Sequence, residues 1–501
     1  MVENSSISAR FTASLLFNIL RGVITLTISI LLARFLGVDD YGRMAFLLAS
    51  FVAFKSLIDM SSSAAFFTFL SKETRSKRFI NIYWGWMAFQ LLFSLVLVGL
   101  VLPDDFLANI WHNEGRLLVI LALIATFMQQ SAWQVASQMA EAQRKTIAMQ
   151  KLNNLIVVSY LLFILLFYYF DELALPLIFI VVSIEWAIGA YFAARMYQGN
   201  DNENDSLSSV FQEFWKYCKP LIPYAWLCFL YEFLDRWMLQ LWGGNEEQAY
   251  YAVAKNFVII VLLATISILR IFWKEIAEAH HQGNMDKMQR LYQKTTRILY
   301  FIGAFIAGAL IPWSAEILDI TVGDEYIDGK ITFMIMLVYP VHQSMGQIGG
   351  AVLFATEKIK LQTIIGSVFM ITSILVAYFV LAPSDAAIPG FNLASEGLAW
   401  KIVVLQFIQV NILTYVIARV FNWQYKWLYQ IVVLGGAIFI GYFTKFLIFE
   451  IFTSVYASIA ISSFLYFIMI IFLLYLYPAQ ILGITKQELN SFSSKVYSKL
   501  S

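Results

Sequence analysis

The chain has 501 residues, of which 60% are hydrophobic and only 13% are charged. A soluble domain carries about a quarter of its residues as charged side chains, so this composition excludes a soluble protein and indicates an integral membrane protein. The formal net charge of +1 implies no nucleic-acid surface, and Cys218 and Cys228 suit neither a disulfide framework nor a metal site.

The first apolar run, 11–33, is too long for the core of a signal peptide, so it is expected to remain as a membrane helix. Apolar runs of about 20 residues recur along the chain, as membrane-spanning helices require, whereas an outer-membrane barrel would show short alternating segments. The predicted fold class is an all-α polytopic membrane protein with about 14 transmembrane helices. The predicted helices are 11–33, 44–70, 79–102, 117–139, 152–170, 174–196, 218–242, 251–272, 298–320, 331–355, 362–382, 395–418, 427–449 and 453–477.

Lys and Arg are concentrated in alternate loops, namely those after the even-numbered predicted helices, and in the C-terminal tail. Because cytoplasmic loops carry the excess of basic residues, both termini are predicted to be cytoplasmic. The basic residues that set this orientation are Lys72, Arg75, Lys77, Arg78, Arg144, Lys145, Lys151, Lys274, Lys287, Arg290, Lys294, Arg297, Lys358, Lys360, Arg419, Lys426, Lys486, Lys495 and Lys499.

A polar stretch rich in Asn and Asp follows the sixth predicted helix and has the composition of a flexible linker. It divides the first twelve helices into two six-helix lobes, predicted to surround a central cavity, with two extra helices at the C-terminal end. The predicted parts are an N-terminal lobe (1–197), an acidic cytoplasmic linker (198–213), a C-terminal lobe (214–420), helices 13 and 14 (421–480) and a cytoplasmic tail (481–501).

A similar pattern of helix, glycine turn, tyrosine and helix occurs near the start of both predicted lobes. It predicts a parallel repeat, as in transporters built from two similar halves around a central site. The residues that form the pattern are Arg34, Gly37, Tyr41 and Gly42 in the first lobe, and Asp235, Arg236, Gly243, Gly244 and Tyr250 in the second.

The loop from Lys274 to Arg297 contains a second helical pattern. After Gly283, apolar residues recur at helical spacing, with Lys and Arg on the other faces. This pattern predicts an amphipathic helix that lies on the inner membrane surface and leads into the helix 298–320.

Seven basic side chains fall inside or at the ends of the predicted membrane helices. Each costs roughly 2.5–3.5 kcal/mol in the middle of a bilayer, so a chain that keeps several is expected to use them to line a cationic cavity for an anionic cargo. Arg21 is the strongest candidate because its own helix offers no acidic neighbour. The seven residues are Arg21, Lys55, Arg236, Lys255, Arg270, Lys401 and Lys445.

Structural roles stay open for several of these residues. Lys55 precedes Asp59 by four positions and Arg236 follows Glu232 by four, so each could form an ion pair within its own helix. Lys255 and Arg270 lie near helix ends, where long basic side chains can extend towards the lipid headgroups.

Carboxylates inside the membrane helices are candidates for coupling transport to an ion gradient. A carboxylate in a polar cavity can exchange protons with either side of the membrane. The candidates for a site that couples H+ or Na+ are Asp59, Glu185 and Asp235.

Enzymatic motifs are absent from the sequence. It contains no Walker motif, no glycine-rich dinucleotide fingerprint, no HExxH and no nucleophile elbow, so no catalytic residue, cofactor or metal site is predicted. The longest loops on the outer side, Pro103–Arg116 and Pro383–Ala394, leave little room for a catalytic domain.

Several stretches resemble a known family. They are LLARFLGVDDYGRMAF from Leu31, LIDMSSSAAF from Leu57, LDRWMLQLWGGNEEQAYYAVA from Leu234, EIAEAHHQGNMDKMQRLYQKTTR from Glu275 and ILDITVGDEYIDG from Ile317. Over nearly all of 5–420, the chain resembles the Wzx-like polysaccharide flippases of the multidrug/oligosaccharidyl-lipid/polysaccharide exporter superfamily. One departure concerns the second predicted helix, where the family often has glycine two residues after the acid and this chain has Ser61.

The resemblance implies a two-lobed carrier that flips undecaprenyl-diphosphate-linked oligosaccharides across a bacterial inner membrane for O-antigen, capsule or exopolysaccharide synthesis. It implies alternating access, an H+ or Na+ gradient as the driving force, and membrane lipids and polysaccharide polymerase machinery as partners. By position and charge, the substrate-binding candidates that it implies are Arg21, Lys55, Arg236, Lys255 and Arg270.

Three other functions agree less well with the sequence. A multidrug exporter of the same superfamily would need an acidic cavity for cationic cargo, and the basic residues argue against it. A membrane-embedded polymerase or glycosyltransferase acting on the same lipid-linked sugars would need a large or carboxylate-rich catalytic loop. A scaffold without transport activity would not need so many charges within the membrane.

Overall fold

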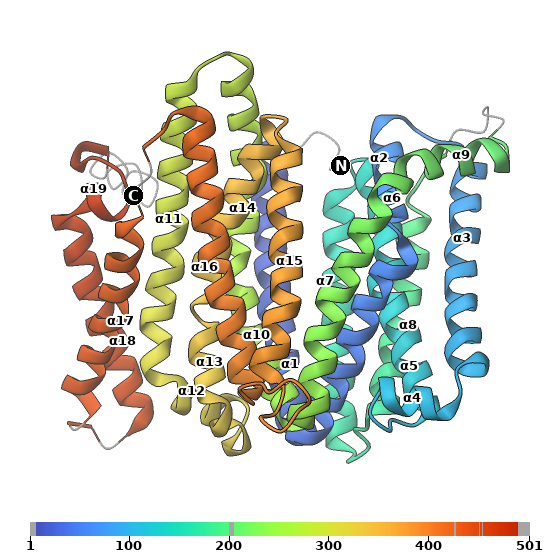
Figure 1. The fold of residues 1–501 in the computed structure, drawn as a ribbon, viewed down its shortest axis with the longest axis horizontal. Helices are drawn as coiled ribbons and strands as arrows, with labels where there is room; N and C mark the ends of the chain where they lie inside the picture. The colour runs from blue at the N-terminus through green and yellow to red at the C-terminus, as the bar shows by residue number, and fades with distance from the viewer. Residues whose placement is uncertain (1–6, 200–204, 425–426, 450, 453, 489–501) are drawn as a thin grey trace. The chain divides into compact units, whose positions relative to one another are not determined.

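The structure is a computed structural model that describes residues 7–199, 205–424, 427–449, 451–452 and 454–488. Side chains are described from residue 16 onward, apart from 260, 263–264, 266–268 and 270–271. Ten helical stretches of the described residues are long and apolar enough to cross a membrane, so the chain is a multi-pass α-helical membrane protein (Figure 1). The predicted count of fourteen stays a prediction.

The chain divides into two compact units, and the long helix α10 (Ile222–His281) runs from one to the other. Unit 1 comprises 1–252 and 370–394, and unit 2 comprises 253–369 and 395–501. The boundary between the two predicted lobes stays a prediction. The helices of unit 1 are α1 (Ile7–Asp59), α2 (Ser62–Lys72), α3 (Lys77–Val96), α4 (Asp104–Ile110), α5 (Arg116–Phe127), α6 (Trp133–Ala142), α7 (Thr146–Tyr169), α8 (Leu175–Ala194) and α9 (Leu207–Cys218).

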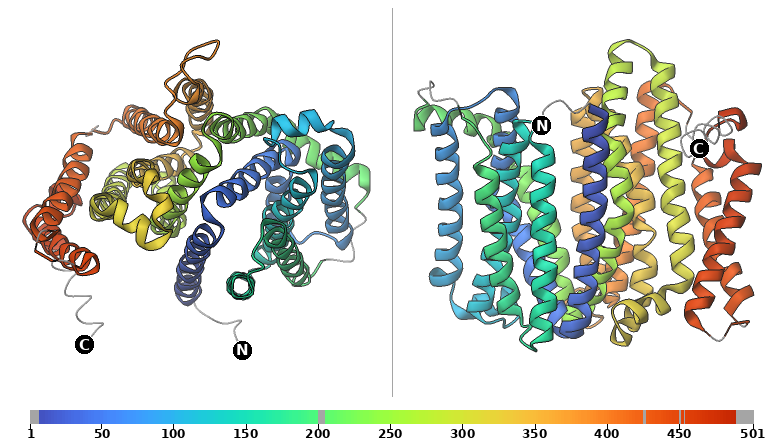
Figure 2. Two further views of the ribbon diagram at one scale, coloured as in Figure 1. Left: turned by 90° about the horizontal axis from the view of Figure 1, so that it is seen from below. Right: turned by 180° about the vertical axis from the view of Figure 1, so that it is seen from behind.

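In unit 2, α11 packs against α14 and α17, and α18 covers α17 at the edge of the unit (Figure 2). One core of this unit gathers Phe272, Ile276, Met288, Tyr292 and Leu299. The helices are α11 (Met285–Leu310), α12 (Ser314–Thr321), α13 (Lys330–Met336), α14 (Tyr339–Ala355), α16 (Ala394–Phe421), α17 (Leu428–Phe449), α18 (Val455–Leu476) and α19 (Pro478–Ile481), while α15 (Ile359–Leu381) begins in unit 2 and ends in unit 1.

Two long helices each contain a sharp kink at a glycine. In α1 the kink is at Gly37, with φ 74° and ψ 174°, and in α10 it is at Gly244, with φ 76° and ψ −168°. Positive φ is accessible to glycine at little cost, which explains why both bends use this residue. The helices predicted at 11–33 and 44–70 therefore join directly through one kink, and those at 218–242 and 251–272 through another. The backbone conformations at the two kinks are nearly the same, as the repeated sequence pattern would require.

The helix predicted at 44–70 is interrupted between α1 and α2. Met60 has φ 47° and Ser61 has φ 67°, both in the left-handed region that non-glycine residues seldom adopt. Asp59 accepts hydrogen bonds from the backbone N–H and the hydroxyl of Ser63 and from the hydroxyl of Ser62. These bonds satisfy donors that the new helix start leaves free. The sequence reasoning missed this break, although it had marked Ser61 as an unusual residue.

Two other predicted segments also differ from the structure. The linker predicted at 198–213 ends earlier, because Ser206 forms a capping box with Ser209 and α9 starts at Leu207. The surface helix predicted after Gly283 is instead the first part of α11, joined to α10 by a tight turn in which Gly283 has φ 68°. Its apolar residues Met288 and Tyr292 are buried in the core of unit 2, so packing against helices replaces the predicted contact with lipid.

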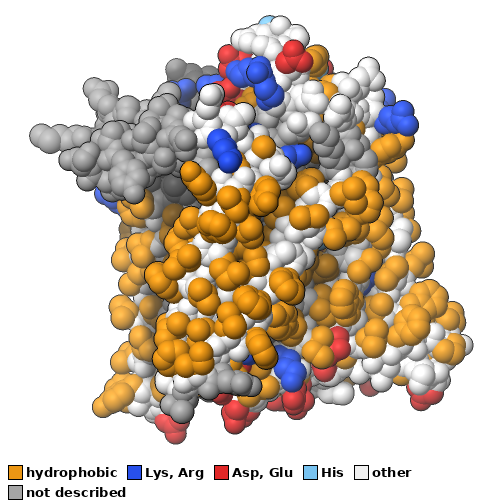
Figure 3. Space-filling view, turned by 90° about the vertical axis from the view of Figure 1, so that its left-hand side faces the viewer, with side chains coloured by type: hydrophobic (Ala, Val, Ile, Leu, Met, Phe, Trp, Pro, Cys, Tyr) orange, Lys and Arg blue, Asp and Glu red, His pale blue; other side chains and the backbone are white. Residues whose placement is uncertain are grey.

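Figure 3 shows one face of the molecule, on which a band of hydrophobic side chains separates two polar ends. Lys and Arg are frequent towards the upper end, and Asp and Glu line much of the lower end. This distribution is the one expected for helices that span a bilayer.

Candidate functional site

A polar cluster lies inside unit 1 around Lys55 of α1. The helical stretch 116–142 contains a π-helical segment, η2 (Met128–Ala132), between α5 and α6. A π-helical turn changes the backbone hydrogen-bond register, and such turns often occur at functional sites. The Lys55 ammonium donates a hydrogen bond of 2.6 Å to the carbonyl oxygen of Gln130 within this turn, and another to the side-chain oxygen of Gln134.

Lys55 and Asp59 do not form the ion pair that their spacing had allowed. Lys55 points towards η2 and α6, whereas Asp59 points towards the start of α2 and accepts hydrogen bonds from Ser62 and Ser63. The Lys55 ammonium has three N–H donors and uses two of them on Gln130 and Gln134. The Lys55 ammonium therefore keeps one N–H donor for a further acceptor.

A cavity of about 20 Å³ lies between Lys55 and Asp59. Polar side chains of Gln90, Ser94 and Thr126 share its walls with aromatic and aliphatic ones. A space of this size can hold about one water molecule and has enough polar partners to bind it. The ammonium and the carboxylate thus line the same small polar space.

Arg21 lies in the other arm of α1. It is 16 residues before Gly37 and Lys55 is 18 after it, so at 1.5 Å per residue both lie about 25 Å from the kink. Within the described residues, the Arg21 guanidinium has no hydrogen bond or ion pair, and Glu141 of α6 is the carboxylate that acts on it electrostatically. Glu141 follows Gln134, the partner of Lys55, by two helical turns. Unit 1 thus holds two basic groups that both interact with α6, Lys55 through a hydrogen bond to Gln134 and Arg21 through the charge of Glu141.

Arg236, unlike Arg21, has several partners within the protein. It is buried in α10, donates a 3.2 Å hydrogen bond to the side-chain oxygen of Gln248, and lies 4.3 Å from the centre of the Tyr251 ring. The side chain of Gln248 in turn donates to the backbone carbonyl of Arg236. These contacts bridge the kink at Gly244, so Arg236 braces the bend. The predicted local pair with Glu232 is not among them.

The first kink has a bridge in the same place. The hydroxyl groups of Ser29 and Tyr41 lie 2.8 Å apart in a hydrogen bond that spans Gly37. Ser29 precedes Gly37 by eight residues, as Arg236 precedes Gly244, and each bridging pair is separated by 12 positions. Both kinks are thus braced from equivalent positions.

The other basic candidates belong to unit 2. Lys255 is exposed in the continuation of α10, and the side chain of Arg270 lies outside the described part of the structure. Lys401 is buried in α16. Lys445 of α17 pairs with Glu316, donates a 2.7 Å hydrogen bond to the carbonyl oxygen of Pro312 and lies 4.4 Å from the centre of the Trp313 ring. Lys445 is therefore a packing contact between α17 and α12.

The three carboxylate candidates differ in their surroundings. Asp59 is held by Ser62 and Ser63, and Asp235 is buried beside Arg236 and also has partners. Glu185 of α8 is 9% exposed, and within the described residues neither of its carboxylate oxygens has a hydrogen-bond partner, although Ser159 of α7 lies close by. An ionised carboxylate without partners is costly in a dry site. Glu185 is the candidate of which both carboxylate oxygens lack a hydrogen-bond partner in the described structure.

The sequence reasoning missed Gln130 and Gln134. The sequence signal was present, since residues 128–134 read MQQSAWQ inside an otherwise apolar helix. Amides in a membrane helix usually find partners on neighbouring helices, and here one serves the lysine of α1. The π-helical register that turns the Gln130 carbonyl towards Lys55 has no sequence signature of its own.

Comparison with known proteins bears on this arrangement. Residues 8–273 match the family described as "Polysaccharide biosynthesis protein". No curated protein matches the chain. Among solved structures, the chain is similar to the lipid II flippase MurJ in an inward closed conformation, with 14% identity, 93% of this chain and 99% of that chain covered, and a TM-score of 0.70.

Multidrug resistance transporters of the MATE family have the same fold. An outward-facing MATE transporter of the MOP superfamily matches with 11% identity, 82% and 95% coverage of the two chains, and a TM-score of 0.52. The Vibrio cholerae MATE transporter VcmN matches with 12% identity, 82% and 98% coverage, and a TM-score of 0.50. At these identities the likeness establishes the fold, which is that of the flippases and exporters predicted from the sequence.

Proposed function

Because the chain belongs to the family of polysaccharide biosynthesis proteins, we propose that it is a transporter that flips a lipid-linked oligosaccharide across the membrane. The observation that carries the proposal is the pair of cationic groups in unit 1. Arg21 has no partner in the described part of the chain, and Lys55 keeps a free donor. A membrane-embedded guanidinium is costly unless it meets an anion for at least part of the transport cycle.

The cargo that fits these groups is a diphosphate-linked sugar, such as an undecaprenyl-diphosphate-linked repeat unit. A guanidinium binds phosphate oxygens through two parallel hydrogen bonds, and an ammonium adds a point charge. MurJ, whose fold the chain shares, is named for a lipid-linked substrate, which supports the same class of cargo. O-antigen, capsule and exopolysaccharide repeat units all share this chemistry.

The proposed location is a bacterial inner membrane with both termini in the cytoplasm. The basic residues are concentrated in alternate loops along the sequence, which supports this orientation. In a variant without native cysteines, a cysteine at Gln282 should resist an impermeant thiol reagent in intact spheroplasts, and one at Asp105 should react. The reverse labelling pattern would overturn the orientation.

Coupling to a proton gradient is proposed to use Glu185. Of the three carboxylate candidates it is the one without hydrogen-bond partners among the described residues. Asp59 accepts hydrogen bonds from Ser62 and Ser63, and Asp235 also has an interaction partner. A proton that binds Glu185 on one side of the membrane and leaves on the other would tie flipping to the gradient.

The direct test is reconstitution. Purified protein in liposomes should move a fluorescently labelled, diphosphate-linked oligosaccharide between leaflets without changing its mass. Arg21→Ala should lose this activity, while Arg78→Ala, which changes an exposed arginine near the start of α3, should keep it. Heavier products would show a polymerase, and movement of cationic dyes without movement of the lipid-linked sugar would show a multidrug exporter. Either outcome would overturn the proposal.

A further inference from the structure

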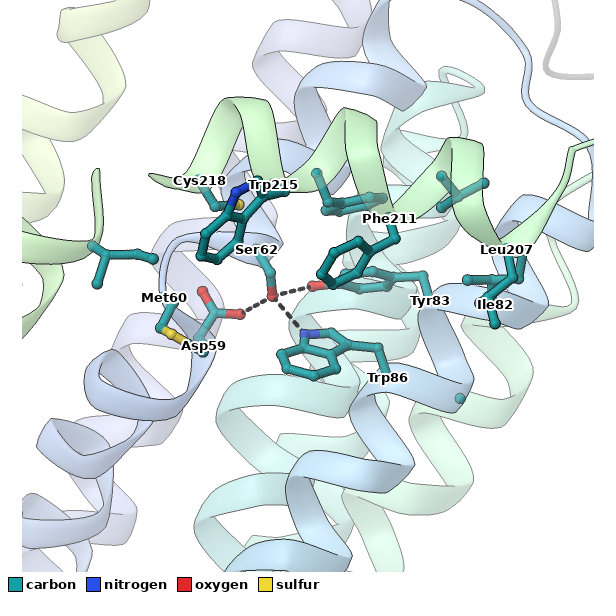
Figure 4. A pocket seen from close by; sticks show the side chains of 14 residues that line it. Asp59, Met60, Ser62, Ile82, Tyr83, Trp86, Leu207, Phe211, Trp215 and Cys218 are labelled. Atoms are coloured by element: carbon teal, nitrogen blue, oxygen red, sulfur yellow. Dashed lines mark hydrogen bonds between the residues drawn. The ribbon is translucent and has the colours of Figure 1, made fainter. Parts of the chain in front are cut away.

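A second pocket lies in unit 1, away from Arg21, beneath the amphipathic helix α9. Its volume is about 410 Å³, within the range of pockets that take small organic ligands. Figure 4 shows α9 crossing over α3, with the pocket between them and Asp59 at its inner end. The lining residues are Asp59, Met60, Ser62, Ile82, Tyr83, Gly85, Trp86, Leu207, Val210, Phe211, Phe214, Trp215, Cys218 and Ile222.

Aromatic packing fixes the position of α9 against the rest of unit 1. The Phe214 ring contacts the rings of Phe69, Phe79 and Tyr83 at centroid distances of 5.2–5.7 Å. Glu213 on another face pairs with Arg75. The roof of the pocket is therefore packed firmly against the rest of unit 1.

The outer edge of α9 remains apolar and uncovered. Leu207, Phe211 and Trp215 follow one another at four-residue spacing, and they are 67%, 64% and 49% exposed. In a membrane protein, such a stripe at a helix that carries polar residues elsewhere lies at the level of the lipid headgroups. A ligand that partitions into the membrane can therefore reach the pocket sideways.

The inner end of the pocket holds the few polar groups of an otherwise apolar lining, together with one carboxylate. Ser62 donates to Asp59 at 2.8 Å and lies within hydrogen-bond distance of the Tyr83 hydroxyl, and the Trp86 indole N–H donates to Ser62 (Figure 4). Asp59 has no ion pair with any described residue, and the nearby Lys55, outside this lining, acts on it electrostatically. Burial raises the pKa of the Cys218 thiol to about 11, so this thiol stays neutral. Asp59 is the one charged side chain of the lining.

The composition of the pocket lining indicates which class of ligand would fit. A carboxylate surrounded by the faces of Trp, Tyr and Phe attracts a cation, and the aromatic walls accept an apolar body. A phospholipid would bring a phosphate next to Asp59, and the lining offers no Lys, Arg or His to neutralise it. The lining therefore favours a cation that carries no anionic group.

We propose that the pocket beneath α9 binds a lipophilic organic monocation, with the cationic group near Asp59 and the apolar body between Phe211, Trp215 and Trp86. The site is distinct from Arg21 and Lys55, which the flippase proposal assigns to the anionic cargo. Binding here does not depend on that proposal being correct.

A large side chain introduced at Gly85 would fill the pocket and so test whether ligands bind there. A β-carbon at Gly85 would meet no atom within 4 Å, so Gly85→Leu should project into the empty space without a clash. Gly366 of α15 is equally open, which makes Gly366→Leu a matched control in unit 2. Both changes replace a helical glycine, so both should leave the fold intact.

The experiment uses the full chain in nanodiscs of phosphatidylcholine, with radiolabelled tetraphenylphosphonium as the cation and tetraphenylborate as an anion of the same size. Saturable binding of the cation, at least tenfold weaker with Asp59→Asn, lost with Gly85→Leu and unchanged with Gly366→Leu, is expected. Monodisperse elution of each variant would verify folding. Equal binding of tetraphenylborate, or unaltered cation binding by Gly85→Leu, would overturn the proposal. Displacement of the cation by phosphatidylethanolamine would assign the pocket to a lipid and overturn it too.

Discussion

The backbone carbonyl oxygen of Asn245 lies 1.9 Å from the point where a β-carbon would stand on Gly42. Gly42 follows the first kink by five residues, and Asn245 directly follows Gly244 in the second. The side chain of Asn245 also donates a 2.8 Å hydrogen bond to Asp39. The two bends of unit 1 are therefore in direct contact, and glycine at position 42 permits it.

Substitution of this glycine should be poorly tolerated. Gly42→Ala would place a methyl group against a backbone oxygen that cannot rotate away, so we expect a loss of about 1–3 kcal/mol of stability. The midpoint of thermal denaturation in detergent measures it. Gly85→Ala is the control, because its β-carbon would enter open space and should leave the midpoint unchanged or higher. Equal midpoints for Gly42→Ala and the unmodified protein would contradict the close contact.

Ser61 is the opposite case, because its backbone conformation favours glycine but the residue has a side chain. Its φ of 67° is in the left-handed region, where a side chain costs about 1 kcal/mol and glycine does not pay that cost. Ser61→Gly should raise stability by about 1 kcal/mol, measured by the same denaturation assay. Ser463→Gly, an exposed site within α18, should lower stability by a similar amount because it weakens a regular helix. A loss of stability at both sites would show that Ser61 is not strained.

Arg21 is expected to act through its charge and its shape. Arg21→Ala should reduce flipping in liposomes to background at normal protein abundance, and Arg21→Lys should restore part of it, because an ammonium replaces the two-pronged guanidinium incompletely. Since Arg21 has no partner among the described residues, the alanine variant should fold normally. Full activity of Arg21→Ala would remove the main support for the anionic cargo.

Glu185→Gln should keep the stability of the protein but remove the coupling of transport to a proton gradient. The amide removes a charge that lacks hydrogen-bond partners in the described structure, so the variant should be at least as stable as the parent. Flipping in liposomes should no longer respond to an imposed proton gradient, whereas Asp59→Asn and Asp235→Asn should keep the response. A normal response of Glu185→Gln, with loss in one of the other two, would move the coupling site to that residue.

Lys445 should matter for stability and not for transport. Lys445→Met leaves Glu316 without its ion-pair partner, so the free energy of unfolding should fall by about 2 kcal/mol. Adding Glu316→Gln to the same chain should recover part of that loss. Flipping per folded molecule should be unchanged in both variants. A specific loss of transport in the stable double variant would return Lys445 to the cargo path.

The sequence predicted the membrane class, the helix positions and the repeated glycine pattern because these depend on local hydrophobicity and on glycine's backbone freedom. It could not predict how Lys55 and Asp59 separate. Their four-residue spacing suggested a pair, but the helix ends at Asp59, and the break at Met60 and Ser61 leaves backbone donors that Asp59 satisfies. Lys55 then binds a carbonyl 75 positions away, in a π-helical turn that only the folded chain reveals.

The bridges across the two kinks occupy equivalent positions in the sequence. A shift of 207 positions superimposes Gly37 on Gly244, and the same shift places Ser29 on Arg236 and Tyr41 on Gln248. The two segments share the position of the brace and differ in its chemistry, a pair of hydroxyls in one and a guanidinium with an amide in the other. The arginine at position 236 therefore has a structural role at a helix bend that is independent of any cargo.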